Sequence, residues 1–136
     1  MVIKVKLIER NEQIPFWDLI GIKVDSIEED RARIKLKVNK KLLNGNNILH
    51  GGVVTSLLDA AMGINLKLNI GEASYATISL TSQFIKSVKE DETIFGSAEV
   101  VQNGRSVACV EARLINQNGE LISIGLGTFK INRPRR

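Results

Sequence analysis

The stretch NGNNILHGGVVTSLLD, residues 44–59, decides the fold of this 136-residue chain. It passes from a polar, asparagine-rich loop into a run that is apolar on nearly all sides from Gly51 onward. A helix that is apolar all round is either buried in a core or spans a membrane. Asp59, Asn65 and Lys67 interrupt this run, and it falls short of the roughly 20 residues that a membrane span requires. The sequence therefore predicts a buried central helix.

Alternating segments on both sides of this helix predict strands. In residues 31–38, apolar and charged residues alternate, which is typical of a half-buried strand with a wet outer face. After the helix, further runs are separated by turn-like residues that include two Asn-Gly pairs, a strong hairpin signal. The expected strands comprise residues 22–27, 31–38, 76–85, 93–101, 106–116 and 121–132.

A short helix is expected before the first strand, over residues 11–20. Asn11 suits its N-cap, Pro15 its first turn and Gly21 its end. Together, the pattern predicts a single α+β domain over residues 1–136, in which an antiparallel sheet of about five to six strands wraps one long central helix.

Composition argues against several classes of function. The net charge is +4, but four Phe, one Trp and one Tyr form no basic stripe interleaved with aromatic residues for nucleic acid. One His and one Cys cannot build a usual zinc site, so we expect no metal. The single cysteine, Cys109, precludes an internal disulfide and fits a reducing cytoplasm. The N-terminus lacks the apolar core of a signal peptide, so we expect a cytoplasmic protein without a membrane partner.

Asp59 is the first candidate for chemistry, because it lies between Leu58 and Ala60 within the apolar helix. A charge in such a setting is costly unless it is paired or hydrogen-bonded. Either it caps a neighbouring backbone group or lies at an exposed edge, or it acts as a nucleophile or general base. We favour the chemical role.

The triplet His50-Gly51-Gly52 at the helix start is the second candidate. The first turn of a helix has N–H groups without partners, and the helix dipole adds positive potential there. Such a point can polarise a carbonyl oxygen as an oxyanion hole. Taken singly, the glycines would indicate a tight turn and the histidine a core residue; in combination they favour a binding site.

The spacing of these candidates predicts a dimer. With a rise of about 1.5 Å per residue, Asp59 lies roughly 10–13 Å along the helix axis from Gly51 and Gly52. That separation is too large for the residues of one chain to share one small reacting group. Two antiparallel copies of the helix, related by a two-fold axis, would bring Asp59 of one subunit near Gly51 of the other.

Three short motifs resemble those of a known family. Leu43-Asn44-Gly45, His50-Gly51-Gly52 and Leu57-Leu58-Asp59 are similar to the signature of the hotdog-fold acyl-CoA thioesterases of the phenylacetate-pathway (PaaI) type. The resemblance extends over nearly the whole chain. It implies a hotdog fold, hydrolysis of an acyl-CoA without a cofactor, and a homodimer that pairs into a homotetramer.

The resemblance also implies roles for single residues. Asp59 would act as the nucleophile or as the base for a water, and the Gly51 N–H would polarise the thioester carbonyl. His50 and Asn44 would orient the thioester and the attacking water from the subunit opposite the carboxylate. Thr77 would assist that water.

Further residues are candidates for substrate binding. Ser79 is the neighbouring hydroxyl on the strand after the central helix, and Gly52 offers a second N–H at the helix start. The phosphates of CoA need cationic contacts, for which Lys86, Arg105 and the tail 133–136 are the candidates.

Two other functions stay open on the sequence alone. A hotdog hydratase or dehydratase also uses a His and a carboxylate, but places them differently. A non-catalytic acyl-CoA-binding module is usually joined to a DNA-binding segment, for which 136 residues leave little room. The complete set of candidate catalytic residues favours the hydrolase.

Overall fold

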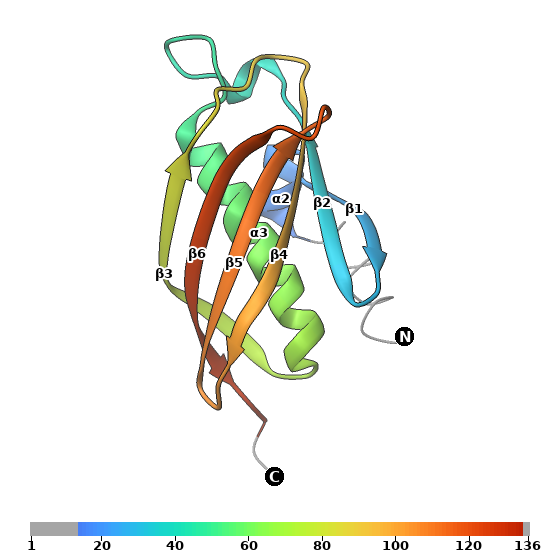
Figure 1. Cartoon of the computed structure of the whole chain (residues 1–136), viewed down its shortest axis with the longest axis vertical. Coiled ribbons are helices and arrows are strands. Elements are labelled where there is room, and N and C mark those ends of the chain that lie inside the picture. Colours follow the sequence, from blue (N-terminus) through green and yellow to red (C-terminus); the bar gives the residue numbers. More distant parts are fainter. Residues whose placement is uncertain (1–13, 135–136) are drawn as a thin grey trace.

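A computed structural model describes residues 14–134 of the chain. One long helix, α3 (Gly51–Ile70), packs against a six-stranded antiparallel sheet with the strand order β1-β2-β4-β5-β6-β3 (Figure 1). The predicted hotdog arrangement, a central helix wrapped by an antiparallel sheet, is thereby confirmed. The other elements are α2 (Pro15–Ile20), β1 (Lys23–Glu28), β2 (Arg31–Lys37), η1 (Lys40–Leu42), β3 (Ser74–Phe84), β4 (Thr93–Asn103), β5 (Val107–Asn116) and β6 (Leu121–Asn132).

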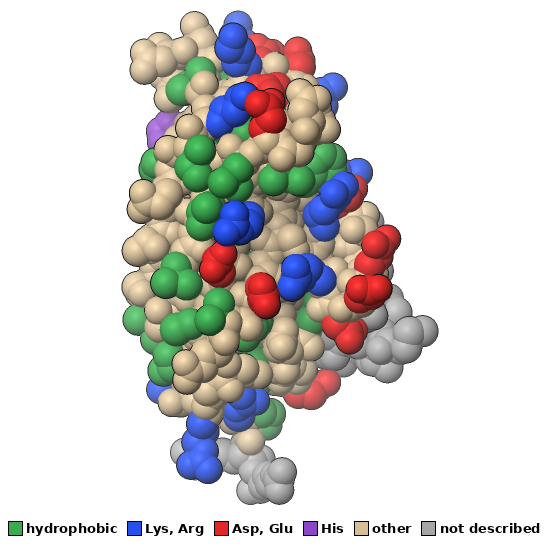
Figure 2. Space-filling model, in the orientation of Figure 1, with side chains coloured by type: hydrophobic (Ala, Val, Ile, Leu, Met, Phe, Trp, Pro, Cys, Tyr) green, Lys and Arg blue, Asp and Glu red, His purple; other side chains and the backbone are tan. Residues whose placement is uncertain are grey.

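The sheet covers α3 with one face and exposes the other. In β2, Ala32, Ile34 and Leu36 are buried, whereas the alternating Arg31 and Arg33 are exposed. Figure 2 views this outer face, on which apolar, basic and acidic side chains are mixed. The alternation that the sequence showed therefore separates a dry inner face from a wet outer one.

Helix α3 is longer than predicted. It has 20 residues, so its length does not exclude a membrane span, and that part of the sequence argument is wrong. Burial distinguishes a core helix from a membrane span instead, because 67% of the apolar stretch of α3 is buried inside the fold. A helix covered in this way by its own sheet is the core helix of the domain.

Asn65 fixes the rotation of α3 against β2. Its side chain is 2% exposed, and its Oδ1 accepts a hydrogen bond from the Ala32 N–H at 2.9 Å. Its Nδ2 donates to the carbonyls of Ala32 at 3.0 Å and Ala61 at 2.9 Å. A buried amide is costly unless such partners satisfy it. This requirement selects one rotation of the helix, and so decides which residues of α3 face β3.

The short helix α2 begins later than predicted. Ile14 is extended and Pro15 is the first helical residue, while Asn11 lies outside the described residues. Gly21 ends the helix at a φ of 98°, in the left-handed conformation that favours glycine.

Strands β1 and β3 form the two edges of the sheet. β1 has 6 residues and a bulge between Val24 and Ser26. β3 has 11 residues, is exposed at nearly every position, and has a bulge between Thr77 and Ser79. The longer and more open of the two edges is therefore the one that runs beside the start of α3.

Candidate active site

His50 is the N-cap of α3. Its Nδ1 accepts a hydrogen bond from the Gly52 N–H at 2.8 Å, which satisfies one of the donors that the first helical turn leaves open. A ring nitrogen that accepts a hydrogen bond carries no proton, so the neutral imidazole has its proton on Nε2. The side chain is exposed, which leaves this Nε2–H accessible to a ligand. The Gly52 N–H, by contrast, is already occupied, so the second donor expected from Gly52 is not free.

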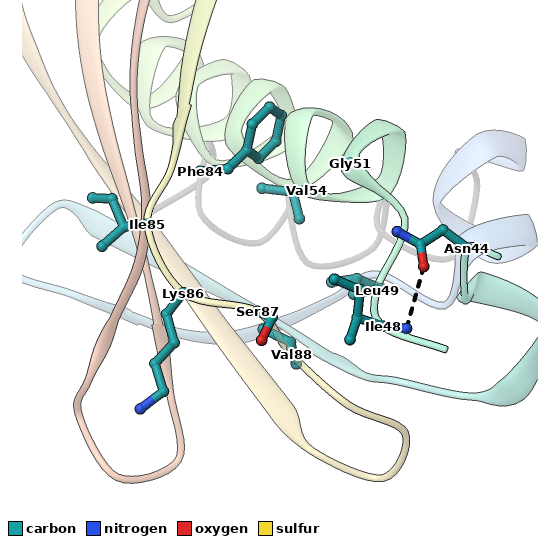
Figure 3. Close-up of a pocket in the computed structure, with 10 residues that line it drawn as sticks. All are labelled: Asn44, Ile48, Leu49, Gly51, Val54, Phe84, Ile85, Lys86, Ser87 and Val88. Carbon is teal, nitrogen blue, oxygen red and sulfur yellow. Dashed lines mark hydrogen bonds between the residues drawn. The ribbon is translucent and has the colours of Figure 1, made fainter. Parts of the chain in front are cut away.

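The Gly51 N–H has no partner among the residues that the structure describes. Gly51 is the first residue of α3, where no carbonyl of an earlier helical turn exists to accept the bond. The residue lines a pocket of about 250 Å³ (Figure 3). A free donor at a helix N-terminus, aided by the helix dipole, suits an oxygen that gains negative charge.

The walls of this pocket are mainly apolar. Phe84, which is 62% exposed, lies over Gly51, so that a Cβ added to the glycine would come within 3.5 Å of its ring. Apolar walls around a few polar groups are the usual composition of a small-molecule site. The apolar lining residues are Ile48, Leu49, Val54, Phe84, Ile85 and Val88, and the others are Asn44, Gly51, Lys86 and Ser87.

Asn44 presents its amide NH₂ to the same pocket. Its Oδ1 accepts hydrogen bonds from two N–H groups of its own loop, that of Asn46 at 2.9 Å and that of Ile48 at 3.3 Å, the second of which Figure 3 shows. Because both partners are donors, the oxygen must be the atom that faces them. The Nδ2 donor has no partner among the described residues. Asn44 and Gly51 therefore supply two free donors to one pocket.

Asp59 and Thr77 meet at the seam between α3 and β3. The Thr77 Oγ1 donates a hydrogen bond to the Asp59 Oδ1 at 2.9 Å. Asp59 is half-buried, rather than enclosed as its apolar neighbours in sequence suggested. The bond fixes the carboxylate, and no hydrogen bond to its Oδ2 is formed among the described residues.

The bulge in β3 separates Thr77 from Ser79. Thr77 pairs with Phe129, which is fully buried on the α3 side, whereas Ser79 pairs with the adjacent Thr128. Adjacent residues of a strand point to opposite faces, so Ser79 lies on the outer face, away from Asp59. Of the two hydroxyls that the sequence offered, Thr77 is the one that contacts the carboxylate.

A second pair of hydroxyls bridges the same seam, and sequence reasoning missed it. Thr55 lies one helical turn before Asp59, and its Oγ1 is 3.1 Å from the Oγ of Ser82. Phe84 was missed as well, because the pairing of a strand end with a helix start depends on the register between elements. The only signal in the sequence was the spacing of four between Thr55 and Asp59, which places both on one helix face.

Two separate groups of residues result within one chain. We call Asn44, His50 and Gly51 the electrophile end, and Asp59 with Thr77 the carboxylate end. Gly51 and Asp59 belong to one unbroken helix, in which eight residues span about 12 Å. The two ends therefore do not meet in a single chain.

The basic candidates are scattered over the molecule. Lys86 lines the pocket and forms an ion pair with Glu120, on the turn between β5 and β6. The hydrogen bonds from the Lys86 ammonium and the Asn116 amide hold the pKa of the Glu120 carboxyl below its usual value. Arg105 lies on the β4–β5 loop, at the end of the sheet opposite to the start of α3 (Figure 1).

Arg133, the described arginine of the C-terminal tail, is engaged away from the pocket. Arg133 donates to the carbonyls of Arg105 at 3.1 Å and Gly104 at 3.2 Å, so it holds the β4–β5 loop. Residues 135–136 lie outside the described part of the chain. Within residues 14–134, no group of three or more His, Cys, Asp or Glu side chains is placed to hold a metal ion.

Comparison with known proteins finds similarity to thioesterases in both sequence and structure. The Thioesterase superfamily matches residues 46–123, a segment that includes His50, Gly51, Asp59 and Thr77. The chain is 26% identical over 108 residues to the acyl-coenzyme A thioesterase PaaI of Escherichia coli, which covers 79% of this chain and 76% of that protein. The structure of the Escherichia coli PaaI protein from the phenylacetic acid degradation operon matches with a TM-score of 0.81 at 22% identity, over 91% of this chain and 87% of that one. A thioesterase of Haemophilus influenzae matches with a TM-score of 0.84 at 16% identity, over 90% and 87% of the two chains.

Proposed function

The chain belongs to the thioesterase superfamily and is a thioester hydrolase, and from this premise we propose that it hydrolyses an acyl-CoA to the free acid and CoA. The observation that carries the proposal is the free N–H of Gly51 in an apolar pocket, at the start of the helix that also carries the fixed carboxylate of Asp59. The first suits the thioester carbonyl, and the second suits attack on it or activation of a water.

A second copy of the chain would unite the two ends. The open edge β3 carries exposed apolar side chains, namely Tyr75 at 37%, Ile78 at 57% and Phe84 at 62%. A long apolar edge with unpaired backbone groups is a template for pairing with another chain. We infer a homodimer built on β3; the pairing of such dimers into a tetramer stays a prediction.

The contacts along β3 support one position for the two-fold axis of the proposed dimer. Thr77 lies beside Asp59, and Phe84 lies beside Gly51. The midpoint between Thr77 and Phe84 falls at residues 80–81. An antiparallel pairing of β3 with its copy about that midpoint would set Thr77 opposite the partner's Phe84, and so Asp59 near the partner's Gly51.

In such a site the donors and the carboxylate have distinct tasks. The Gly51 N–H donates to the thioester oxygen and stabilises the negative charge that develops there. The Nε2–H of His50 and the Nδ2–H of Asn44 are further donors for that oxygen or for the attacking water. Thr77 acts as a positioning residue, because its hydroxyl holds the Oδ1 of Asp59 and leaves the Oδ2 to react.

Two routes to the products are compatible with this arrangement. In one, the Asp59 carboxylate attacks the carbonyl carbon, the carbon–sulfur bond breaks and CoA leaves as a thiolate, after which water attacks the Asp59 carbonyl of the mixed anhydride and releases the free acid. In the other, the carboxylate takes a proton from a water that attacks the carbonyl, and CoA leaves directly. A single turnover in ¹⁸O-water distinguishes them, since only the anhydride route places the label in the Asp59 side chain.

The pocket also limits the acyl group and the position of CoA. Its volume of about 250 Å³ and its apolar walls suit an aryl or medium-chain acyl group. Lys86 at the pocket is placed to contact a phosphate of CoA. A hydrolysis screen over aryl and straight-chain acyl-CoAs tests this; hydration of an enoyl-CoA with no thioester hydrolysis would contradict the proposed reaction.

Mixing two inactive variants tests the shared site directly. Asp59→Asn removes the carboxylate, and His50→Asn removes the imidazole donor but keeps a side-chain oxygen able to cap the helix. If the ends act across the dimer, a mixed dimer has one intact site and one site with both defects. Equal amounts, unfolded and refolded together, should then regain about a quarter of the wild-type activity, because half of the dimers are mixed.

Two other outcomes of the mixing experiment would contradict the proposal. If both ends act within one chain, every site in the mixture carries a defect and activity stays at the level of the separate variants. If either variant alone hydrolyses thioesters at the wild-type rate, the role assigned to its residue is wrong.

A further inference from the structure

A second concavity lies on the outer face of the sheet, on the side that α3 does not cover. It measures about 470 Å³ and is formed by strands β1, β2 and β4 together with the residue that ends α2. We call it the outer groove; its charged and aromatic lining residues are Lys23, Asp25, Arg33, Lys35, Lys37 and Phe95. Figure 2 shows basic and acidic side chains close together on the side of this face that lies over β1 and β2.

Two lysines of the outer groove face each other across neighbouring strands. Lys23 of β1 pairs directly with Lys35 of β2, so both side chains stand on the same face. Like charges in directly opposite positions destabilise a sheet. Lys37 lies two residues further along β2, on the same face. An anion bound between these lysines would attract both ammonium groups and so offset their mutual repulsion.

Arg33 is already held in place at the floor of the groove. Its Nε donates to the Asp25 Oδ2 at 2.8 Å, and its guanidinium lies 4.1 Å from the centre of the Phe95 ring. Asp25 is the extra residue of the β1 bulge, and its second oxygen is 3.5 Å from the Lys35 ammonium. One carboxylate therefore organises two cations, as bulged residues at binding sites often do.

The charges of the outer groove do not balance. It contains four cations, Lys23, Arg33, Lys35 and Lys37, and one carboxylate, Asp25, which leaves three positive charges in excess. Lys23 and Lys37 make no ion pair or hydrogen bond through their side chains among the described residues. Two free ammonium groups beside a fixed guanidinium form a set of donors suited to phosphate oxygens.

We propose that the outer groove binds a phosphorylated small molecule that carries at least two negative charges. Its size is that of a ligand site, which favours a small anion over an extended macromolecule. Two kinds of ligand would present these phosphate groups: the nucleotide end of CoA, and a separate phosphorylated compound. The site is distinct from the thioester pocket, and binding of an anion to it can be measured separately from thioester hydrolysis.

Pyrophosphate is the probe for this site, and isothermal titration calorimetry at low ionic strength is the measurement. Lys37→Gln should weaken pyrophosphate binding by about tenfold, since one charge-assisted contact is lost. The matched control is Lys130→Gln, which removes one positive charge from the exposed end of β6. The control should bind pyrophosphate within about twofold of the wild type. The proposal would be overturned if both substitutions weakened pyrophosphate binding equally, or if neither weakened it.

Thermal unfolding provides an independent readout. Without an anion, Lys23→Gln should leave the Tm unchanged or raise it, because it removes the repulsion with Lys35. With pyrophosphate, the wild type should gain more in Tm than this variant, because a ligand that binds only the folded state stabilises it. An equal gain in both proteins would contradict the proposal.

Competition with CoA identifies the source of the anion. If CoA displaces pyrophosphate from the wild type, the outer groove holds the nucleotide end of CoA. If both bind at once, the groove is a separate anion site. Failure of pyrophosphate to bind at all at millimolar concentration would remove the site.

Discussion

The two edges of the sheet differ in every feature that controls pairing between strands. β1 is 6 residues long, is interrupted by a bulge and carries charged side chains such as Lys23 and Glu28. β3 is 11 residues long and carries exposed Tyr75, Ile78 and Phe84. Short, bulged and charged edges resist pairing with another chain, whereas long apolar edges invite it. The comparison supports the proposal that β3, and not β1, is the edge that pairs with a second copy.

The edge strands also differ in what lies behind them. β3 runs past both the electrophile end and the carboxylate end of α3, and it contacts each of them. β1 lies beyond β2, with its face turned to the outer groove. The same edge therefore has two roles in the proposed function, as the interface between copies and as the support of the reacting groups.

The largest expected effect comes from removing the carboxylate beside β3, with the matching change at β1 as the control. Asp59→Asn beside β3 should lower kcat for acyl-CoA hydrolysis by about a thousandfold, because the nucleophile or general base is lost. Glu28→Gln at the end of β1 makes the same chemical change at the other edge and should leave kcat unchanged. Steady-state kinetics with circular dichroism as a folding control measures both. A near-normal kcat for folded Asp59→Asn would remove this residue from the mechanism.

A lysine placed at each edge tests the interface itself. Ile78→Lys should convert the dimer to a monomer and lower activity by at least about a hundredfold, because a charge is added to the apolar edge while both reacting ends stay intact. Ser26→Lys at the β1 edge is the matched control and should change neither quantity. Sedimentation equilibrium measures the mass of each variant. An active monomer would show that one chain suffices.

Packing behind β3 predicts the next largest effect. Gly63 of α3 lies against Tyr75, and a Cβ at this glycine would approach the phenol oxygen more closely than real Cβ atoms approach any atom. Gly63→Ala should therefore lower the free energy of unfolding by about 1–3 kcal/mol. Tyr75→Phe in the same chain removes the nearest atom and should restore part of that loss. Urea denaturation measures both, and a second loss in place of recovery would show that the clash is not the cause.

The sequence was informative where a pattern repeats over many residues. The alternation in Arg31–Lys37 and the apolar run after Gly51 predicted the inner face of the sheet and the core helix, because burial imposes those periods directly. The Asn-Gly pairs predicted both hairpins at the β4–β5 and β5–β6 connections. The predicted elements differ from the observed ones at their ends, as for α2, whose capping residue is Ile14 rather than Asn11, and the short helix η1 was not predicted.

Details that depend on a single local contact were beyond the sequence. One bulged residue in β3 turned Ser79 away from Asp59 and left Thr77 in contact with it. The capping bond to His50 occupies the Gly52 N–H, whereas the Gly51 N–H has no partner among the described residues. The run of basic residues on β2 is compatible with a solvated face and with mild attraction for a phosphorylated small molecule. The sequence does not show the groove itself, because the groove depends on the register of β2 with β1 and β4. None of these local features alters the pattern of apolar and polar residues, so none can be inferred from that pattern.

A smaller effect is expected from the hydroxyl that links β3 to α3. Thr77→Val removes the donor to Asp59 but keeps the shape of the side chain, and should lower kcat about tenfold with little change in KM. Thr77→Ser keeps the donor and should retain most of the activity. The matched control on the outer side of β3 is Ser79→Ala, which leaves the Asp59 contact intact. If Thr77→Val and Ser79→Ala have equal effects, the hydrogen bond does not position the carboxylate.

The smallest expected effect concerns the ion pair that ties the chain just after β3 to the β5–β6 turn. Lys86 holds the pKa of the Glu120 carboxyl below its usual value of 4.5, so the folded state favours the charged form. A lowered pKa stabilises the fold above the pKa of the unfolded chain, and this contribution is lost as pH falls through the lower, folded value. Glu120→Gln should therefore be slightly less stable than the wild type near neutral pH, and this difference should shrink as the pH falls below 4.5 and close in acid, once the folded-state carboxyl is protonated. Urea midpoints at the two pH values measure it. Because both side chains are exposed, the effect is small; a difference that persists unchanged in acid would assign it to the Asn116 side chain and the turn, and not to the charge.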